Sequence, residues 1–516
     1  MLATIRSGAV VGVEAYPVDV EVDLAKGMMV FATVGLPSSA VCESKTRVKS
    51  ALQNTGLDFP QKRVVVNLAP AHIRKEGTAF DLPMALGILI ADGQVPAAPF
   101  EGVLVVGELS LDGGLRGARG VLPLAAWAKR AGLGRLLVPE ESGAEAAAVG
   151  GVEVWVARDL EEVVCVARGE RPARLLPPVD PSALSAARAA AGGVDLADVR
   201  GQEGARRALE VAAAGGHNLL FLGPPGSGKT MLARRLPTIA PPLSFEERLE
   251  ASVVASVAGV LPPDEPLLLS RPFRAPHHSL SQAALAGGGP LCRPGEVSLA
   301  HNGVLFLDEL PEFKRAALEA LRQPMEDGEI VIARAHGVLT YPARFALVAA
   351  MNPCPCGYYG DPKRACTCPA NAIRAYLNRV SGPLLDRIDL QVSVEAVDPL
   401  TLRGQTQGER SEVVRARVTA ARARQLERFR GLDVHSNGQM RPSEVRRFCE
   451  LTADAEALFA RAIARLGLSA RAHDRVLKVS RTIADLAGAE RVEAAHVAEA
   501  TQYRQLDRVW AMQGAA

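Results

Sequence analysis

One octapeptide constrains the fold of this chain more than any other feature of its sequence. Residues 223–230 are Gly-Pro-Pro-Gly-Ser-Gly-Lys-Thr, which matches the pattern G-x-x-x-x-G-K-[ST]. The segment 218–222 before the octapeptide, Asn-Leu-Leu-Phe-Leu, predicts a buried strand, and a helix is predicted from Met231. A glycine-rich loop in this position directs backbone N–H groups and a helix N-terminus at phosphate oxygens. The octapeptide therefore predicts an α/β fold with a parallel sheet and a nucleotide phosphate site at one edge.

The residue types of this loop are suited to binding phosphate and Mg²⁺. Lys229 can reach the β- and γ-phosphates, the Thr230 hydroxyl can bind Mg²⁺, and the glycines let the backbone wrap closely around the phosphates. ATP and Mg²⁺ are therefore the expected cofactors. The residues expected to line the nucleotide are Gly223, Pro224, Pro225, Gly226, Ser227, Gly228, Lys229 and Thr230.

Two further apolar runs end in polar side chains. Residues 304–307 precede Asp308 and Glu309, and residues 346–351 precede Asn352. Ligands of parallel sheets bind at the carboxyl ends of the strands. We expect Asp308 to hold the magnesium shell, Glu309 to orient and activate the attacking water, and Asn352 to position that water. Taken alone, such residues are also ordinary strand ends, but their order after the phosphate loop favours the catalytic interpretation.

The chain divides into segments of different composition. Residues 171–193 are rich in Pro and then in Ala, and they predict a linker. We expect one domain over residues 1–170, an ATPase core over 194–396 and a helical domain over 397–516. With no run of about 18 apolar residues and no secretory signal, we expect a cytoplasmic protein without membrane contact.

The order of these motifs resembles that of AAA+ ATPases, and more narrowly that of the magnesium-chelatase-like YifB/ComM family. The resemblance extends over almost the whole chain and implies a P-loop core with a parallel sheet and a helical lid. The stretches that carry it are 223–230, 273–279, 294–303, 307–313, 351–354 and 382–389.

The resemblance also implies roles by position. Asn352 matches the sensor-1 residue, and Arg387 matches the arginine finger that reaches the γ-phosphate of a neighbouring subunit. Such a finger implies a ring, most simply a homohexamer. Arg471 best matches the sensor-2 residue of the lid, with Arg475 as the alternative. The adenine is expected to be cradled by residues corresponding to Gly201 and Gln202.

The N-terminal segment resembles the α+β domain that ribosomal protein S5 shares with Lon-type proteases. Residues 75–82 and 107–117 carry this resemblance. By position, Ala79 stands where the protease has its nucleophilic Ser, and Leu122 where it has its Lys. A Ser–Lys mechanism needs a hydroxyl and an amine, which Ala and Leu do not have. We therefore expect this domain to be catalytically inactive and to serve binding or ring assembly.

Four of the eight cysteines lie within fifteen residues of one another. They are Cys354, Cys356, Cys366 and Cys368. Two close pairs bridged by a turn are typical of a structural Zn²⁺ site, although C-x₂-C spacing is more common. Four unrelated reduced thiols, or a redox-active pair, are the alternatives. Lys363 and Arg364 lie inside the loop, where a metal-folded turn would present them to nucleic acid.

The family resemblance implies a DNA motor that drives helicase or branch-migration activity in recombination or natural transformation. Two insertions, residues 276–297 and a predicted hairpin over 328–342, correspond to pore-lining segments, with Arg334 and His336 near the hairpin tip. Single-stranded or branched DNA is then the expected partner. The alternative is a chelatase-type ATPase subunit that powers metal insertion or remodels a protein partner. The N-terminal domain and the cysteines favour the DNA motor.

Overall fold

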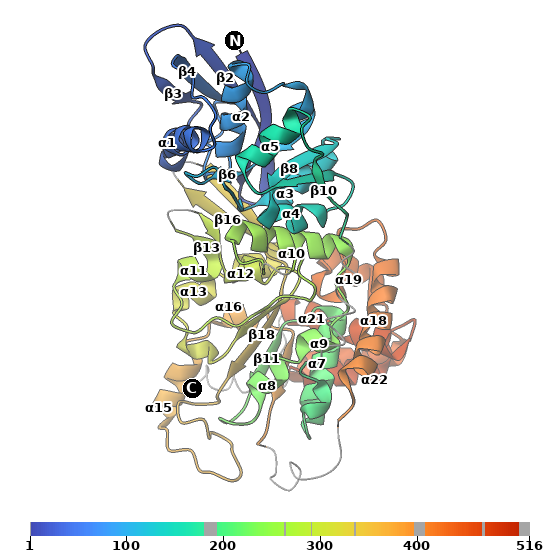
Figure 1. Cartoon of the computed structure of the whole chain (residues 1–516). Helices are drawn as coiled ribbons and strands as arrows, with labels where there is room; N and C mark the ends of the chain where they lie inside the picture. Colours follow the sequence, from blue (N-terminus) through green and yellow to red (C-terminus); the bar gives the residue numbers. More distant parts are fainter. Residues whose placement is uncertain are drawn as a thin grey trace. The chain divides into compact units, whose positions relative to one another are not determined.

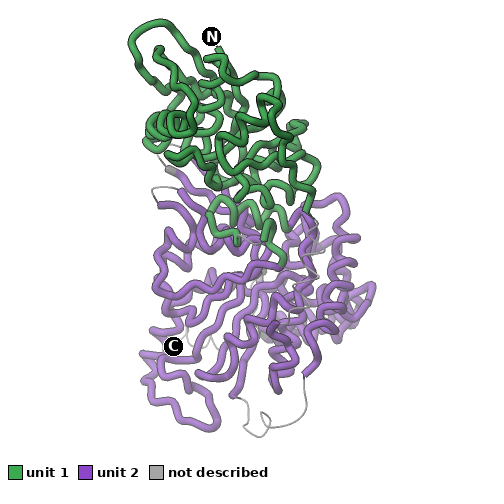
Figure 2. Tube along the Cα trace, in the orientation of Figure 1, with its two compact units in different colours: residues 1–187, 248–269 green, residues 188–247, 270–516 purple. Residues whose placement is uncertain are grey.

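The computed structural model describes the chain except for residues 1, 180–192, 263–264, 290–291, 335–336, 397–407, 467–469 and 505–516. The described residues form two compact units (Figure 2). The first unit comprises residues 1–187 and 248–269, and the second comprises 188–247 and 270–516. Residues 248–269 therefore belong to the N-terminal unit, although they lie inside the range expected for the ATPase core.

The first unit begins with a four-stranded sheet in the order β1-β2-β4-β3 (Figure 1). Alternate residues at the start of β1 are buried, as the period of a half-buried strand requires. Helix α2 packs on β1 and β2, and all of its residues are buried. The elements are β1 (Leu2–Val11), β2 (Glu14–Ala25), β3 (Phe31–Val34), α1 (Ser39–Asn54), β4 (Arg63–Ala69) and α2 (Asp81–Ala91).

A second sheet of this unit has the order β10-β9-β8-β5, with β10 antiparallel to β9. Strand β10 falls within residues 171–193, which the Pro-rich composition had indicated as a linker, because its backbone completes this sheet. Leu122 is fully buried, and Ala79 packs against the same hydrophobic cluster. The elements are β5 (Val103–Val105), β6 (Glu108–Leu109), β7 (Leu115–Arg116), α3 (Val121–Arg130), β8 (Arg135–Pro139), α4 (Glu140–Ala147), β9 (Glu153–Ala157), α5 (Leu160–Ala167) and β10 (Arg174–Leu176).

The second unit is built on a five-stranded sheet in the order β12-β15-β18-β11-β19. All of its strand pairs are parallel, so the carboxyl ends of the strands meet at one edge. Leu219 and Phe221 of β11 belong to one hydrophobic core and Leu220 to another, so both faces of this strand are covered. The strands are β11 (Leu219–Leu222), β12 (Phe273–Arg274), β15 (Val304–Leu307), β18 (Ala346–Met351) and β19 (Leu390–Ser393). The predicted α/β class with a parallel sheet is confirmed.

Helices of the core and two insertions complete this part of the second unit. The predicted hairpin is formed by β16 and β17, which pair from Glu329 opposite Pro342 to Arg334 opposite Gly337. His336 and the side chain of Arg334 lie outside the described residues. The remaining elements are α7 (Glu203–Gly215), α8 (Lys229–Ala233), α9 (Leu236–Ile239), α11 (Gln282–Ala286), β13 (Gly287–Gly288), β14 (Arg293–Pro294), α12 (Glu296–Leu299), α13 (Arg315–Glu319), α14 (Arg322–Asp327), β16 (Glu329–Arg334), β17 (Gly337–Pro342), α15 (Ala370–Leu377) and α16 (Gly382–Leu385). Helix α10 (Phe245–Ala258) begins in the second unit and continues in the first.

The C-terminal part is helical, as its three-four spacing of apolar residues predicts. Helix α21 packs on α7, α18 and α22, and its Val476, Val479 and Ile483 share a core with strand β11. None of the helices in the described part of the chain is both long and apolar enough to cross a membrane. The helices are α18 (Ser411–Arg428), α19 (Pro442–Phe448), α20 (Ala453–Leu466), α21 (Ala470–Ala487) and α22 (Ala494–Gln502).

Candidate functional site

The loop between β11 and α8 needs its glycines. A Cβ on Gly223 would lie 2.0 Å from the carbonyl oxygen of Val394, so no side chain fits there. Gly226 and Gly228 have φ angles of 76° and 92°, in the left-handed region that glycine adopts without strain. The loop thus turns tightly at the carboxyl end of β11 and presents its backbone to the same edge of the sheet.

Lys229 lies inside this loop. Its Nζ donates hydrogen bonds to the carbonyl oxygens of Gly223 at 2.7 Å and Pro224 at 2.8 Å, and to Oδ1 of Asn352 at 3.2 Å. Burial lowers the pKa of Lys229, while the charge of Asp308 opposes that shift. The structure therefore brings the predicted phosphate-binding amine, at the start of α8, together with the predicted sensor-1 amide, which follows β18.

The predicted magnesium ligands also lie together. Thr230 Oγ1 donates to Asp308 Oδ2 at 2.7 Å. Hard oxygen ligands at about 2.1 Å from an octahedral Mg²⁺ stand about 3 Å apart when adjacent, so this pair fits two neighbouring positions. The other carboxylate oxygen of Asp308 accepts the backbone N–H of Glu309 at 3.0 Å. Glu309 has a φ of 53°, and its side chain is 55% exposed, which leaves the carboxylate open to water.

The residues expected near the adenine lie against the same loop. Gly201 and Gln202 have φ angles of 64° and 57°. Gln202 Nε2 donates to the carbonyl oxygen of Ser227 at 3.4 Å and also to that of Glu395. The turn before α7 is therefore tied to the phosphate loop.

Arg387 lies at the opposite edge of the sheet. Asn218, the residue before β11, donates from Nδ2 to the Arg387 carbonyl at 2.9 Å. Four residues of strand separate this position from the phosphate loop, which corresponds to about 13 Å at 3.3 Å per residue. The Arg387 side chain is buried, forms an ion pair with Glu326 and donates to the Pro383 carbonyl at 2.6 Å. The Arg387 backbone thus lies at the end of the sheet opposite the phosphate loop of its own chain.

The two candidates for sensor 2 differ in what the structure describes. Arg471 lies in α21, and its side chain is outside the described part. Arg475, one helical turn later, donates to Asp389 Oδ1 at 2.6 Å and to the Arg387 carbonyl at 3.0 Å. Burial by itself raises the pKa of Asp389, but the charge of Arg475 and the nearby His217, whose Nδ1 lies 3.6 Å from Asp389 Oδ2, outweigh burial and lower it. Arg475 therefore joins the lid to the edge that carries Arg387.

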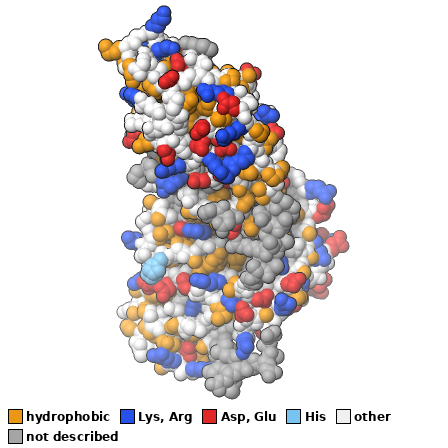
Figure 3. Space-filling view, in the orientation of Figure 1, with side chains coloured by type: hydrophobic (Ala, Val, Ile, Leu, Met, Phe, Trp, Pro, Cys, Tyr) orange, Lys and Arg blue, Asp and Glu red, His pale blue; other side chains and the backbone are white. Residues whose placement is uncertain are grey.

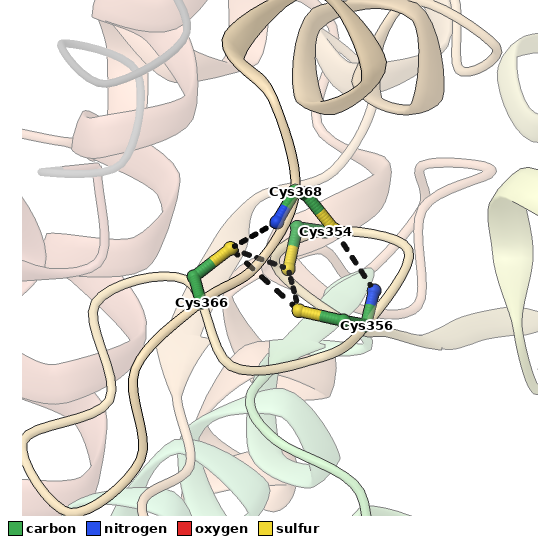
Figure 4. A group of neighbouring side chains, drawn as sticks. All are labelled: Cys354, Cys356, Cys366 and Cys368. Carbon is green, nitrogen blue, oxygen red and sulfur yellow. Dashed lines mark hydrogen bonds between the residues drawn. The ribbon is translucent and has the colours of Figure 1, made fainter.

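The four clustered cysteines converge on one point (Figure 4). The Sγ atom of Cys354 lies 3.3 Å from that of Cys356 and 3.6 Å from that of Cys366, and Cys356 and Cys366 are 3.6 Å apart. The Sγ of Cys368 accepts the backbone N–H of Cys356 at 3.4 Å. A tetrahedral Zn²⁺ with bonds of about 2.3 Å separates its sulfur ligands by about 3.8 Å. The cluster is therefore compatible with zinc.

Three contacts at these sites were not anticipated from the sequence. His278 Nδ1 lies 3.2 Å from Glu309 Oε2, Gly357 of the cysteine loop lies against Pro225 of the phosphate loop, and Glu326 pairs with Arg387. Each joins residues that are distant in the sequence and share no periodic pattern. Only the family stretch 273–279 drew attention to His278 beforehand.

The sheet order, the phosphate loop with its two acids and the helical C-terminal part define an AAA+ ATPase core of the magnesium-chelatase type. The chain matches the family descriptions "Magnesium chelatase, subunit ChlI" over residues 195–402, "Subunit ChlI of Mg-chelatase" over 20–142 and "Magnesium chelatase, subunit ChlI C-terminal" over 408–504. This membership supports ATPase activity with ATP and Mg²⁺.

Similarity to individual proteins narrows the family. The chain is 46% identical over 517 residues to competence protein ComM of Haemophilus influenzae and 44% identical over 509 residues to the YifB protein of Salmonella typhimurium, with 98% of each chain covered. It is also 30% identical over 145 residues to Lon protease 2 of Bacillus subtilis, covering 27% of this chain and 26% of that one, in keeping with a Lon-like N-terminal domain. The chain belongs to the YifB/ComM family of magnesium-chelatase-like AAA+ proteins.

Proposed function

We propose that this protein is a cytoplasmic, ring-forming ATPase that uses ATP hydrolysis to move along DNA, as a helicase or branch-migration motor in recombination or natural transformation. The observation that carries the ATPase part is the convergence of Lys229 with Asn352 and of Thr230 with Asp308 at one edge of the sheet. The DNA part is supported by 46% identity over the full chain to a relative that is named a competence protein.

In this mechanism the chain's own residues bind and orient the reactants. Lys229 and the loop N–H groups hold the β- and γ-phosphates, and Asn352 places the attacking water next to the γ-phosphate. Thr230 and Asp308 would hold Mg²⁺, which neutralises charge on the phosphate oxygens when it is bound. Glu309 takes the proton of the attacking water, for which its exposed carboxylate is accessible.

The position of Arg387 supports the proposed ring. Because the Arg387 backbone lies at the end of the sheet opposite its own phosphate loop, we expect its guanidinium to reach the nucleotide of a neighbouring subunit once the Glu326 ion pair opens. Arg471 is the proposed sensor-2 residue. A homohexamer would bring the insertion over 276–297 and the β16–β17 hairpin to DNA in its central pore.

Charge offers moderate support for DNA binding. Residues 401–516 hold 19 Arg and one Lys against 14 acidic residues. On the face drawn in Figure 3, Lys and Arg side chains are interspersed with Asp and Glu. Contacts with phosphates would then come from individual basic residues presented on loops, such as Lys363 and Arg364 in the cysteine loop.

We also propose that the four clustered cysteines hold a structural Zn²⁺ ion. The Sγ separations among Cys354, Cys356 and Cys366 are 3.3 to 3.6 Å, close to those of a Cys₄ zinc site, and all four Sγ atoms lie within 4.8 Å of one another. Metal analysis of protein purified without chelator should return about one zinc per chain. A result near zero would refute this site.

The deciding experiment is steady-state ATP hydrolysis with Mg²⁺, with and without single-stranded and branched DNA, with Lys229→Ala as the blank. Stimulation by DNA that is absent from the blank would support the DNA motor.

The match to a magnesium chelatase subunit over residues 195–402 favours a second function, in which the ATPase powers metal insertion or remodels a protein partner. Hydrolysis that no DNA form alters would select this alternative.

A further inference from the structure

A histidine from a neighbouring strand end contacts the carboxylate proposed to act as the base. His278 follows strand β12, and its Nδ1 lies 3.2 Å from Oε2 of Glu309. The imidazole meets the ring of Phe313 edge to face at a centroid distance of 6.4 Å, and its centroid lies 4.1 Å from that of His277. The edge-to-face contact with Phe313 limits the orientations in which His278 meets the carboxylate.

The contact with His278 bears on how the carboxylate of Glu309 is oriented. The backbone of Glu309 is fixed by its N–H bond to Asp308 Oδ1, but three side-chain torsions still separate that backbone from the carboxylate. A general base works only when one oxygen lies within hydrogen-bond reach of the water it deprotonates. A hydrogen bond from the Nδ1–H of His278 to Oε2, for which the 3.2 Å separation leaves room, would fix the end of the side chain and leave Oε1 to accept the proton.

We propose that His278 is a positioning residue for ATP hydrolysis, which orients the Glu309 carboxylate through an Nδ1–H···Oε2 hydrogen bond. This inference rests on the role proposed above for Glu309. His278 itself does not touch the nucleotide or the water in this arrangement; it acts through the carboxylate.

The adjacent histidine provides a matched control. His277 is of the same type, belongs to the same loop and packs against the ring of His278. Its Nδ1, however, accepts the backbone N–H of Ser279 at 3.3 Å and lies 2.9 Å from the Ser279 hydroxyl. Removing the His277 imidazole therefore takes away a comparable ring without taking away the contact of His278 with Glu309.

The test compares His278→Ala, His278→Asn and His277→Ala by steady-state hydrolysis and by binding of a fluorescent ATP analogue. We expect His278→Ala to lower kcat about tenfold or more, because general-base catalysis contributes 10²- to 10⁴-fold and depends on geometry. Its KM and analogue affinity should stay close to wild type, since Lys229 and Thr230 are untouched. His278→Asn should recover much of kcat because the Asn amide can place an N–H near the position of Nδ1. His277→Ala should stay within about twofold of wild type.

Combining His278→Ala with Glu309→Gln separates this inference from the proposed function. Measured in single turnovers with excess enzyme, Glu309→Gln should hydrolyse ATP very slowly, and adding His278→Ala should slow it no further. Wild-type turnover in Glu309→Gln would refute the proposed base. If Glu309→Gln is inactive but His278→Ala matches wild type, or the double variant is much slower than Glu309→Gln, or His277→Ala loses as much activity, the positioning role is wrong.

Discussion

The contact between the cysteine loop and the phosphate loop predicts that a single methyl group added at Gly357 will weaken ATP binding. Gly357 has a φ of 87°, and a Cβ there would lie 2.5 Å from Cδ and 2.9 Å from Cγ of Pro225. Both atoms belong to the proline ring, which cannot rotate away as the end of a flexible side chain can. Gly357→Ala therefore has to displace the phosphate loop or the cysteine loop.

A second glycine of the same loop allows the cost of the steric clash to be separated from the cost of the backbone conformation. Gly360 has a φ of 80°, and a Cβ at that position meets nothing within 4 Å. Both Ala substitutions incur the left-handed backbone cost of about 1–2 kcal/mol. Only Gly357→Ala adds the overpacking, which costs about 1–3 kcal/mol. If the whole overpacking cost destabilises the ATP-binding conformation of the phosphate loop, ATP affinity falls roughly 5- to 150-fold, at about 1.4 kcal/mol per factor of ten.

The assay is titration of each variant with a fluorescent ATP analogue, with the zinc content measured on the same samples. We expect a Kd raised about fivefold or more for Gly357→Ala and nearly unchanged for Gly360→Ala, with equal zinc in both because neither residue is a ligand. Equal Kd values for the two variants would show that the cysteine loop does not constrain the phosphate loop. Lost zinc in Gly357→Ala alone would show that the strain enters the metal site instead.

The other predictions concern the magnesium ligand, the cysteine cluster and the buried ion pair of the lid. Asp308→Asn should reduce Mg²⁺-dependent hydrolysis by about 10²-fold or more in a steady-state assay, because a neutral amide is a poor ligand for Mg²⁺. Cys354→Ser should lower both the zinc content and the melting temperature, whereas Cys42→Ser, at an exposed cysteine, should change neither. Asp389→Asn should lower the free energy of unfolding by about 3–5 kcal/mol in urea at neutral pH. The folded-state pKa of Asp389 lies below its unfolded value of about 4. The loss of stability in Asp389→Asn is therefore full above about pH 4 and shrinks as the pH falls below that value. Glu450→Gln, in an exposed ion pair, should cost less than about 1 kcal/mol at any pH.

How far the sequence predicted the structure depended on whether a feature is local. The glycine-rich loop, the apolar strands before Asp308 and Asn352 and the paired cysteines are local patterns, and the structure contains the corresponding strands and brings the four thiols within 4.8 Å of one another. Residues 248–269 and strand β10 departed from the expected boundaries, since side-chain packing and strand pairing with the first unit decide their place.

The sequence also did not predict the contacts between the ends of separate strands, for a related reason. His278 and Glu309 follow the neighbouring strands β12 and β15, and only the order of strands in the sheet brings their side chains together. The spacing of residues along the chain carries no information on that order. The same holds for Arg387 and Glu326, which the family pattern gave no reason to pair.

Strand β11 links the two edges on which the proposed ring depends. At its carboxyl end begins the loop that holds Lys229. At its amino end Asn218 binds both the Arg387 carbonyl and, through its backbone N–H, the Asp389 carboxylate at 3.0 Å. Arg475 from lid helix α21 bonds to the same two residues. A movement of the lid would therefore be transmitted through Arg475 to the segment that carries Arg387. In the proposed ring this segment would face the next subunit's nucleotide, so the contacts of Arg475 favour communication between neighbouring sites.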